Sequence, residues 1–232
     1  MRKRKIIYIF LFTLLVSFIY YAHAKELPKW FLFNKDNALK EWQEKIFKGK
    51  VMYSVESEKQ DGHLSAISEK SCSGLFYRIK FNSKKLPLIS WQWKVVKFPE
   101  KAPLGLGDVN KKQGWIEKDD YAARVYVIFP SFNFRKTKSI EYIWDKELPE
   151  GKILTSPYSK NIKLIIVESG MDNIDKWVFE KRNIYEDYKA SFGSPPRSNV
   201  GAIALMTDTD NTMSTAEALY KNMKVGYRDE AE

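Results

Sequence analysis

Apolar and polar residues alternate with a period of two along most of this chain, and this pattern limits its fold more than any other feature. Because successive side chains of a β-strand point to opposite faces of a sheet, the alternation predicts strands with one buried face. The apolar members of the clearest runs are Val51, Tyr53 and Val55; Leu75, Tyr77, Ile79 and Phe81; Ile89, Trp91, Trp93 and Val95; Ala123, Val125, Val127 and Phe129; and Ile140, Tyr142 and Trp144.

Two further runs, residues 162–167 and 200–206, are almost continuously apolar, as expected for central strands covered on both faces. In all, about nine or ten short strands fit into the chain, without the alternating strand–helix units of a parallel α/β sheet. We therefore expect an all-β fold, an antiparallel β-sandwich with one or two short helices. Its core should include Trp91, Val125, Val127 and Ile203.

Local signals indicate where the short helices lie. Residues 184–192 fit one helix, which Gly193 would stop. The string STAE at 214–217 matches a capping box that would begin a second helix. Residues 101–118 form the longest loop-like segment, and loops of this length are typically functional or mobile.

The first residues have the pattern of a secretory signal peptide, with a basic start, an apolar middle and an Ala-x-Ala end. We expect residues 1–24 to be removed and residues 25–232 to form a single β-sandwich domain. The alternative is an uncleaved anchor, but the apolar run is shorter than the ~20 residues that a spanning helix needs. The protein is therefore predicted to be exported, periplasmic or secreted, with no membrane span after cleavage.

Composition excludes several kinds of chemistry. The full chain has 39 Lys and Arg against 29 Asp and Glu, a net charge of +10, but these charges form no basic stripe, so we expect no nucleic-acid partner. Without the leader the chain keeps one cysteine, Cys72, and one histidine, His63. An internal disulfide, a Cys/His zinc site and a well-placed Ser-His-Asp triad are therefore excluded.

Polar residues at the ends of expected strands are the best candidates for a ligand site. Asp120 opens a strand in which Arg124 points away from the apolar face, a pair that suits a sugar hydroxyl or a carboxylate. Glu168 ends another strand, while Arg182 and Asp208 follow two more. We predict that these five residues converge at one end of the sandwich. The alternative is that they form internal ion pairs that only hold the fold.

The string DTDNT at 208–212 places oxygen ligands at alternate positions, as half of a calcium loop does. Asp208 and Asp210 are therefore candidate calcium ligands, although the Gly and the distal Glu of a complete loop are missing. The alternative is an Asx-type turn between two strands. No other cofactor is expected.

Each of four tryptophans could either pack in the core or stack on a sugar ring of a ligand. Trp91 and Trp93 share a strand face with aliphatic residues, which favours the core. Trp115, in the long loop, and Trp144, next to an aspartate, are the better candidates for stacking on a sugar.

A glycosidase would need two carboxylates across a cleft. No spacing singles out such a pair, so the question of whether the chain is an enzyme stays open. The available carboxylates are Asp119, Asp120, Glu141, Glu168, Asp208 and Asp210.

Several strings, taken together, resemble the bacterial domain-of-unknown-function family DUF3047. They are WQWKV at 91–95, DDYAARVY at 119–126, ESG at 168–170, KRN at 181–183, DY at 187–188 with FG at 192–193, and MTDTDNT at 206–212. The resemblance runs from about Trp42 to Tyr227 and implies an exported bacterial protein, without an activity. The string YKNMKV at 220–225 is also similar to the closing strand of galactose-binding-like jelly rolls, which hints at carbohydrate-binding sandwiches.

These observations favour a non-catalytic exported β-sandwich that binds a glycan or another cell-envelope component. A carboxylate-based, glycosidase-like enzyme acting on polysaccharides is the first alternative. The second is a purely structural envelope protein whose polar motifs only hold the fold.

Overall fold

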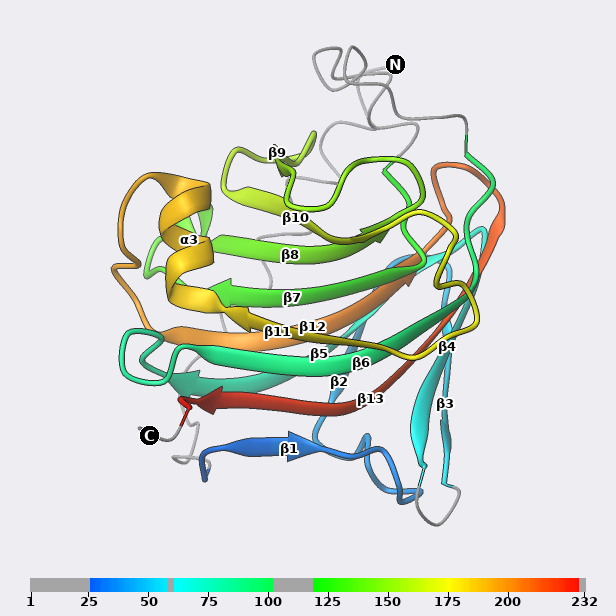
Figure 1. The fold of residues 1–232 in the computed structure, drawn as a ribbon, viewed down its shortest axis with the longest axis horizontal. Coiled ribbons are helices and arrows are strands. Elements are labelled where there is room, and N and C mark those ends of the chain that lie inside the picture. The colour runs from blue at the N-terminus through cyan, green and yellow to red at the C-terminus, as the bar shows by residue number, and fades with distance from the viewer. Residues whose placement is uncertain (1–25, 58–60, 102–118, 230–232) are drawn as a thin grey trace.

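The computed structural model of the chain describes residues 26–57, 61–101 and 119–229. Two β-sheets pack face to face, and their inward-facing side chains form the main core (Figure 1). The expected all-β sandwich is confirmed. None of the helices in this described part combines the length and the apolar character that a membrane crossing requires.

The first sheet, sheet A, is antiparallel throughout its described strands. It consists of β1 (Lys29–Phe31), β3 (Met52–Glu56), β4 (His63–Glu69), β6 (Leu88–Lys97), β11 (Val178–Asn183) and β13 (Thr215–Tyr227). The strand order is β11-β6-β13-β4-β3, and β1 pairs with β13.

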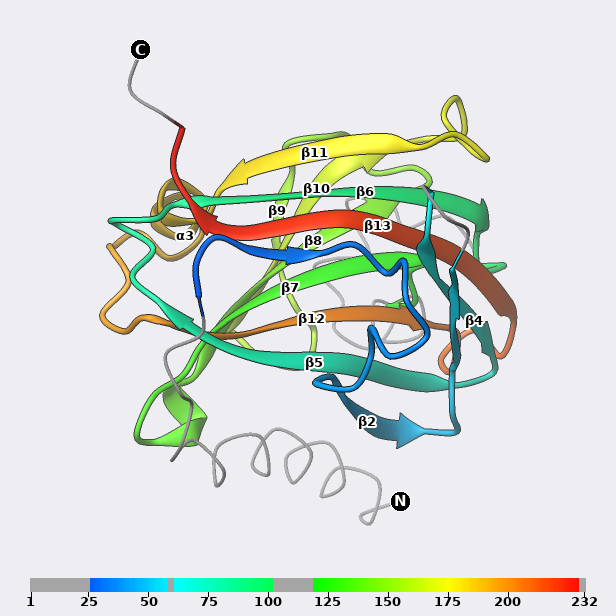
Figure 2. The ribbon, with the colours of Figure 1, turned by 90° about the horizontal axis from the view of Figure 1, so that it is seen from below.

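The second sheet, sheet B, consists of β2 (Gln43–Lys48), β5 (Cys72–Phe81), β7 (Ala123–Phe129), β8 (Lys138–Asp145), β9 (Ile153–Thr155), β10 (Ile162–Ser169) and β12 (Val200–Asp208). Its order is β2-β5-β12-β7-β8-β10-β9, of which Figure 2 shows β2, β5, β12 and β7 following one another. Among the described strands of this sheet, β8 and β10 form the one parallel pair, an exception to the expected antiparallel arrangement. The chain between β8 and β10 must therefore return along the sheet, and β9 is part of that return.

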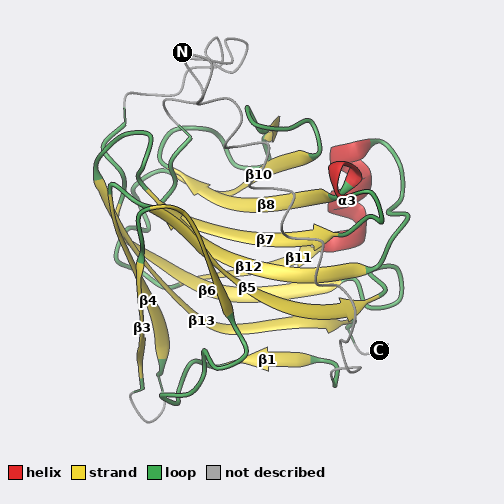
Figure 3. Cartoon of the chain, turned by 180° about the vertical axis from the view of Figure 1, so that it is seen from behind, coloured by secondary structure: helices red, strands yellow, loops and turns green. Residues whose placement is uncertain are grey.

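The helix expected at 184–192 is α3 (Ile184–Phe192), which lies at one end of the strands (Figure 3). At its start, the side-chain oxygen of Asn183 accepts a hydrogen bond from the backbone N–H of Glu186. Gly193 ends the helix with a φ of 68°, in the left-handed region that glycine adopts at low cost. A short 3-10 helix, η2 (Phe134–Lys136), follows β7.

The second expected helix is wrong, because the STAE string at 214–217 leads into strand β13. This strand lies between β6 and β4 and pairs with both. Its inward-facing residues Ala216, Ala218 and Tyr220 are almost fully buried. Backbone pairing on two sides outweighs the local capping signal.

Aromatic rings from both sheets fill the centre of the sandwich. The rings of Trp91 and Trp93 in β6 lie edge to face, with centroids 5.3 Å apart. The ring of Tyr142 in β8 lies 5.3 Å from that of Trp91, and the ring of Trp144 lies 6.1 Å from that of Trp93. Full burial confirms the expected core positions, which are Trp91, Val125, Val127 and Ile203.

A second apolar cluster covers part of the outer face of sheet B, the face turned away from sheet A. Its members are Tyr121, Ile143, Leu148, Leu154, Ile162, Leu164 and Ile166. Leu148, in the return between β8 and β10, packs into this cluster, while Leu154 belongs to β9, the edge strand of sheet B. The run at 162–167 is therefore buried on both faces, as its continuous apolar sequence predicts.

Trp91→Ala should lower the free energy of unfolding by about 3–5 kcal/mol, because it removes a fully buried aromatic side chain. Chemical denaturation followed by circular dichroism measures the change. The control is Phe132→Ala, since the Phe132 ring is 104% exposed and its loss should cost less than about 0.5 kcal/mol. Similar small effects of both substitutions would contradict this packing.

Candidate functional site

Charged side chains occupy another part of the outer face of sheet B. In β7, the inward residue Val125 lies between the outward residues Arg124 and Tyr126. Glu141 of β8 is the register partner of Tyr126 and therefore shares its outward face. Asp208 ends β12, the neighbour of β7 on the other side. Three adjacent strands thus bring these charged residues together.

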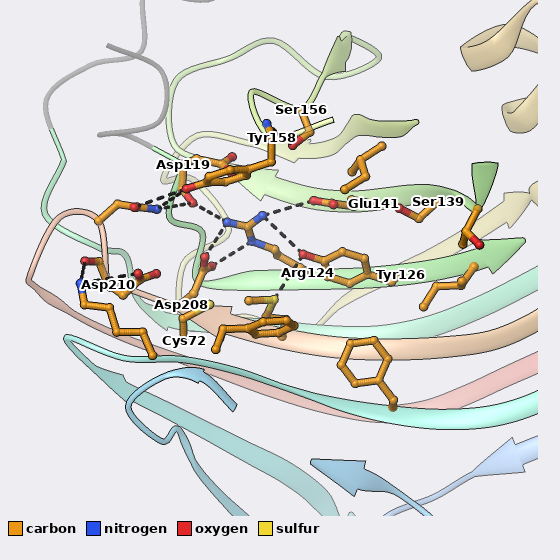
Figure 4. Close-up of a pocket in the computed structure, with 18 residues that line it drawn as sticks. Cys72, Asp119, Arg124, Tyr126, Ser139, Glu141, Ser156, Tyr158, Asp208 and Asp210 are labelled. Atoms are coloured by element: carbon orange, nitrogen blue, oxygen red, sulfur yellow. Dashed lines mark hydrogen bonds and ion pairs between the residues drawn. The ribbon is translucent and has the colours of Figure 1, made fainter. Parts of the chain in front are cut away.

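The guanidinium of Arg124 lies at the centre of this group, which we call the Arg124 cluster (Figure 4). Its Nε donates to Asp208 Oδ1 at 2.9 Å and its Nη2 donates to Asp208 Oδ2 at 2.7 Å, a two-point ion pair. Nη1 donates to Glu141 Oε2 at 3.2 Å, and Nη2 donates to the backbone carbonyl of Asp119 at 2.6 Å. Arg124, Asp208 and Glu141 are each 3% exposed, so water screens these charges little.

The segment before β7 closes one side of the Arg124 cluster. The backbone N–H of Tyr121 donates to Asp208 Oδ1 at 3.1 Å. The Tyr121 ring centre lies 4.5 Å from the guanidinium carbon of Arg124 and 3.9 Å from the ammonium nitrogen of Lys101. Lys101 also pairs with Asp145 at 3.1 Å. The Tyr121 ring therefore contacts two cations, each with a carboxylate partner.

Asp120 lies beside the Arg124 cluster and holds a turn. Its carboxylate accepts hydrogen bonds from the backbone N–H groups of Asn211 at 3.1 Å and Thr212 at 2.6 Å. Asp120 is fully buried. Its oxygen atoms therefore fix the turn after β12 from a distant part of the chain, whereas an Asx-type turn would be held by an Asp or Asn of the string itself.

A cavity of about 170 Å³ lies over the Arg124 cluster. Aromatic side chains form part of its wall: Phe47 of β2, Phe76 of β5, Tyr126 of β7 and Tyr158 of the return between β8 and β10. All four are at least partly exposed. Its other lining residues with polar side chains are Lys48, Cys72, Asp119, Arg124, Thr137, Ser139, Glu141, Ser156, Asp208, Asp210 and Asn211.

Two buried polar atoms of this cavity have no hydrogen-bond partner among the described residues. They are Asp119 Oδ1 and Ser139 Oγ, and both residues are only 2% exposed. Buried polar atoms in native proteins nearly always have a partner. These two atoms are therefore candidates to receive the hydrogen-bonding groups of a ligand.

Burial shifts two carboxyl groups of the cavity toward neutral pKa values. It raises the pKa of Asp119 to about 6, although the charges of Arg124 and Lys101 oppose the shift. It also raises the pKa of Glu141 to about 7, against the opposing charge of Arg124. Both groups can therefore take up or release a proton near neutral pH.

The expected calcium ligands Asp208 and Asp210 lie close to Cys72, and one donor atom from each of the three lies within 4.8 Å of the others. However, both oxygens of Asp208 already accept hydrogen bonds from Arg124, and Asp210 lies 3.6 Å from the ammonium of Lys48. Calcium takes roughly six to eight oxygen ligands, and a thiolate suits softer metals. This set of donors does not fit a calcium ion.

Glu168 and Arg182 lie outside the Arg124 cluster, which corrects the expected convergence of five residues. Arg182 forms a two-point ion pair with Asp187 of α3, at 3.0 and 2.7 Å. Glu168 accepts a hydrogen bond from Asn173 at 3.3 Å. Because α3 begins directly after β11, Asp187 in its first turn lies close enough to Arg182 to form this pair.

The tryptophans expected to stack on a sugar have different outcomes. Trp144 is fully buried, since it shares the inward face of β8 with Ile140 and Tyr142. Its Nε1 donates to the backbone carbonyl of Gly170 at 3.1 Å. Trp144 is therefore a core residue, and that expectation is wrong. Trp115 lies outside the described residues, as does the leader.

Sequence patterns identify Arg124 and Asp208 but place Asp119 and Glu141 only in a larger pool of carboxylates. One usable signal was present, because Glu141 is a charged residue inside the otherwise mostly uncharged strand KSIEYIWD. Ser139 and the aromatic wall of the cavity carry no comparable signal. They become neighbours only through the order of the strands in sheet B.

Arg124→Met should lower the free energy of unfolding by about 3–5 kcal/mol, because the buried carboxylates of Asp208 and Glu141 lose their cation. The double substitution Arg124→Met with Asp208→Leu should cost less than the sum of the two single substitutions, since the pair is removed as a unit. Urea denaturation of the wild type, the two single variants and the double variant measures this coupling. Strictly additive costs would show that the two side chains do not interact.

Several solved structures are similar to this chain at low sequence identity. The family 30 carbohydrate-binding module of a cellulosomal cellulase of Clostridium thermocellum has 8% identity and a TM-score of 0.43, over 82% of this chain and 93% of that module. The non-crystalline cellulose specific module CBM28 has 10% identity and a TM-score of 0.41, over 89% and 97%. The enzymatically active domain of tailspike protein 4 of bacteriophage CBA120 has 6% identity and a TM-score of 0.43; the match covers 84% of this chain but 20% of that one.

Among curated proteins, no relative of the chain is found. The model of one family, described as "Protein of unknown function (DUF3047)", matches residues 40–224, which is most of the chain. This match confirms the resemblance seen in the sequence strings. The chain belongs to the DUF3047 family.

Proposed function

We propose that the cavity on sheet B binds one sugar ring of a glycan, and that the protein is a non-catalytic glycan-binding β-sandwich. The observation that carries this proposal is that one cavity is lined by partly exposed aromatic rings and by buried polar atoms without a hydrogen-bond partner in the described part of the chain. A pyranose presents apolar C–H faces, which pack on aromatic rings, and hydroxyl groups, which need hydrogen-bond partners. The cavity offers both kinds of contact.

The arrangement of the wall supports a ring-shaped ligand. Phe76 comes from β5 and Tyr126 from β7, and β12 lies between these two strands. Aromatic side chains therefore stand on both sides of β12. The cavity volume of about 170 Å³ is below the roughly 300–1,000 Å³ typical of pockets for drug-sized ligands, so it suits a single sugar ring.

The floor of the cavity is held in place by the protein itself. Arg124 is fixed by hydrogen bonds to Asp208, Glu141 and the backbone of Asp119. A ligand would therefore meet polar groups that are already oriented, and less ordering of side chains would oppose its binding.

A carboxylate-based enzyme acting on polysaccharides is a second candidate, favoured by the pKa values of Asp119 and Glu141. A glycosidase uses one protonated and one ionised carboxyl group at its working pH, and values of about 6 and about 7 suit both states near neutrality. Release of reducing sugar ends from a polysaccharide by the wild type, and its loss in Glu141→Gln, would support this candidate instead.

Tyr158→Ala should weaken the binding of a glycan by about 2- to 10-fold, because it removes an aromatic ring from the cavity wall without opening the core. A glycan array of the mature protein selects the ligand, and isothermal titration calorimetry measures its affinity. Phe179→Ala is the matched control, since this aromatic residue is 58% exposed but belongs to β11 of sheet A. Its affinity should equal that of the wild type.

Two outcomes would contradict the glycan proposal. If the folded wild type binds no glycan on the array, the purely structural alternative is favoured. If Tyr158→Ala and Phe179→Ala bind the selected glycan as well as the wild type does, the ligand lies somewhere other than this cavity.

Export is a separate part of the proposal. We propose that the mature protein begins at Lys25 and meets its ligand outside the cytoplasm, as the basic, apolar and Ala-x-Ala pattern of the leader indicates. N-terminal sequencing of the protein from fractionated native cells should give a start near Lys25 in the exported fraction. A start at Met1, or recovery only from the cytoplasm, would refute it.

A further inference from the structure

Four carboxyl groups and two cations line the cavity within the described part of the chain. Two of the carboxyl groups have a cation of their own. Asp208 forms the two-point ion pair with Arg124, and Asp210 lies 3.6 Å from the ammonium of Lys48. Each of these two pairs is close to neutral as a unit.

Asp119 and Glu141 are left without a cation of their own among the described residues. Glu141 shares Arg124 through one hydrogen bond of 3.2 Å, and Asp119 contacts Arg124 through its backbone carbonyl. The charge of Lys101 acts on Asp119, but this ammonium already pairs with Asp145 at 3.1 Å. Figure 4 shows Asp119 and Glu141 on opposite sides of the guanidinium.

We propose, on the basis of the function proposed above, that the cavity selects an amino sugar, whose ammonium group it prefers over the hydroxyl of a neutral sugar. An ammonium brings three N–H donors and a positive charge for two carboxyl groups that have no cation of their own among the described residues. Asp119 Oδ1, to which none of the described residues donates, is the acceptor for one of these donors. Ser139 Oγ, also unpartnered among the described residues, can donate to or accept from a neighbouring sugar hydroxyl.

The cavity should also reject acidic sugars, although the chain as a whole carries a net charge of +10. A uronic acid or a phosphate would add negative charge beside two buried carboxyl groups that have no cation of their own among the described residues. The raised pKa values of Asp119 and Glu141 have the same origin, since burial without enough nearby positive charge favours the protonated form. Local charge in a buried site outweighs the screened charges of the surface.

The test measures the affinity of the mature protein for three matched pairs at pH 7: glucosamine and glucose, galactosamine and galactose, mannosamine and mannose. In at least one pair the amino sugar should bind about 10-fold or more tightly than its hydroxyl counterpart, as a hydrogen bond to a buried charged group provides. Asp119→Asn should reduce this ratio toward one while the neutral sugar still binds. Asp172→Asn, an exposed acid outside the cavity, is the matched control and should keep the ratio.

The outcomes separate this inference from the glycan proposal on which it rests. Equal affinities within every pair, or tighter binding of glucuronic acid, would overturn the ammonium selection and leave glycan binding intact. Cyclohexylamine, which has the amine without the hydroxyls, should bind weakly; binding as tight as that of the amino sugar would refute recognition of a sugar. If none of the sugars binds the folded protein, both proposals fail. Glu141→Gln should also lower the ratio, and it tests the second carboxyl group if Asp119→Asn does not fold.

Discussion

The buried guanidinium of Arg124 is the interaction on which the outer face of sheet B depends. A permanently charged group in the interior is costly unless its donors have partners. Here those partners come from β8, from β12 and from the segment that leads into β7. One side chain thus connects three strands with a loop, and the acidic residues of the cavity floor gather around it. Arg124 therefore determines how the charged groups of the cavity floor are arranged.

Most of the sandwich could be predicted from the alternation of apolar and polar residues. One buried face per strand leaves few arrangements other than two packed sheets, and helix α3 had a clear stop signal in Gly193. The parallel pairing of β8 with β10 could not be predicted, because a strand carries no local mark of its neighbour's direction. The expected second helix failed for a similar reason, since the pairing of β13 with strands distant in sequence decides its conformation.

Fewer features of the candidate site than of the fold could be predicted from the sequence. Arg124 and Asp208 could be brought together because one lies at the start of an expected strand and the other at the end of another, which antiparallel strands bring to the same end of the sandwich. The partner of Arg182 could not be chosen, because several acidic residues were available and only the position of α3 decides between them. The expectation for Trp144 followed from the aspartate beside it; the periodicity of its own strand, which places it with Tyr142, was the better guide. Periodicity thus predicts the face of a side chain better than it predicts its partners.

The return between β8 and β10 forms part of the cavity wall, whereas the strands of sheet B form the cavity floor. Parallel neighbours cannot be joined by a tight hairpin, so the chain needs a connection that travels back along the sheet. That connection supplies Ser156 and Tyr158 to the cavity, while the strands supply its floor. Surface connections tolerate changes in length and sequence that strands in a sheet do not. The residues of this one segment can therefore change, and with them the entrance of the cavity, while the strands keep the charged residues of its floor.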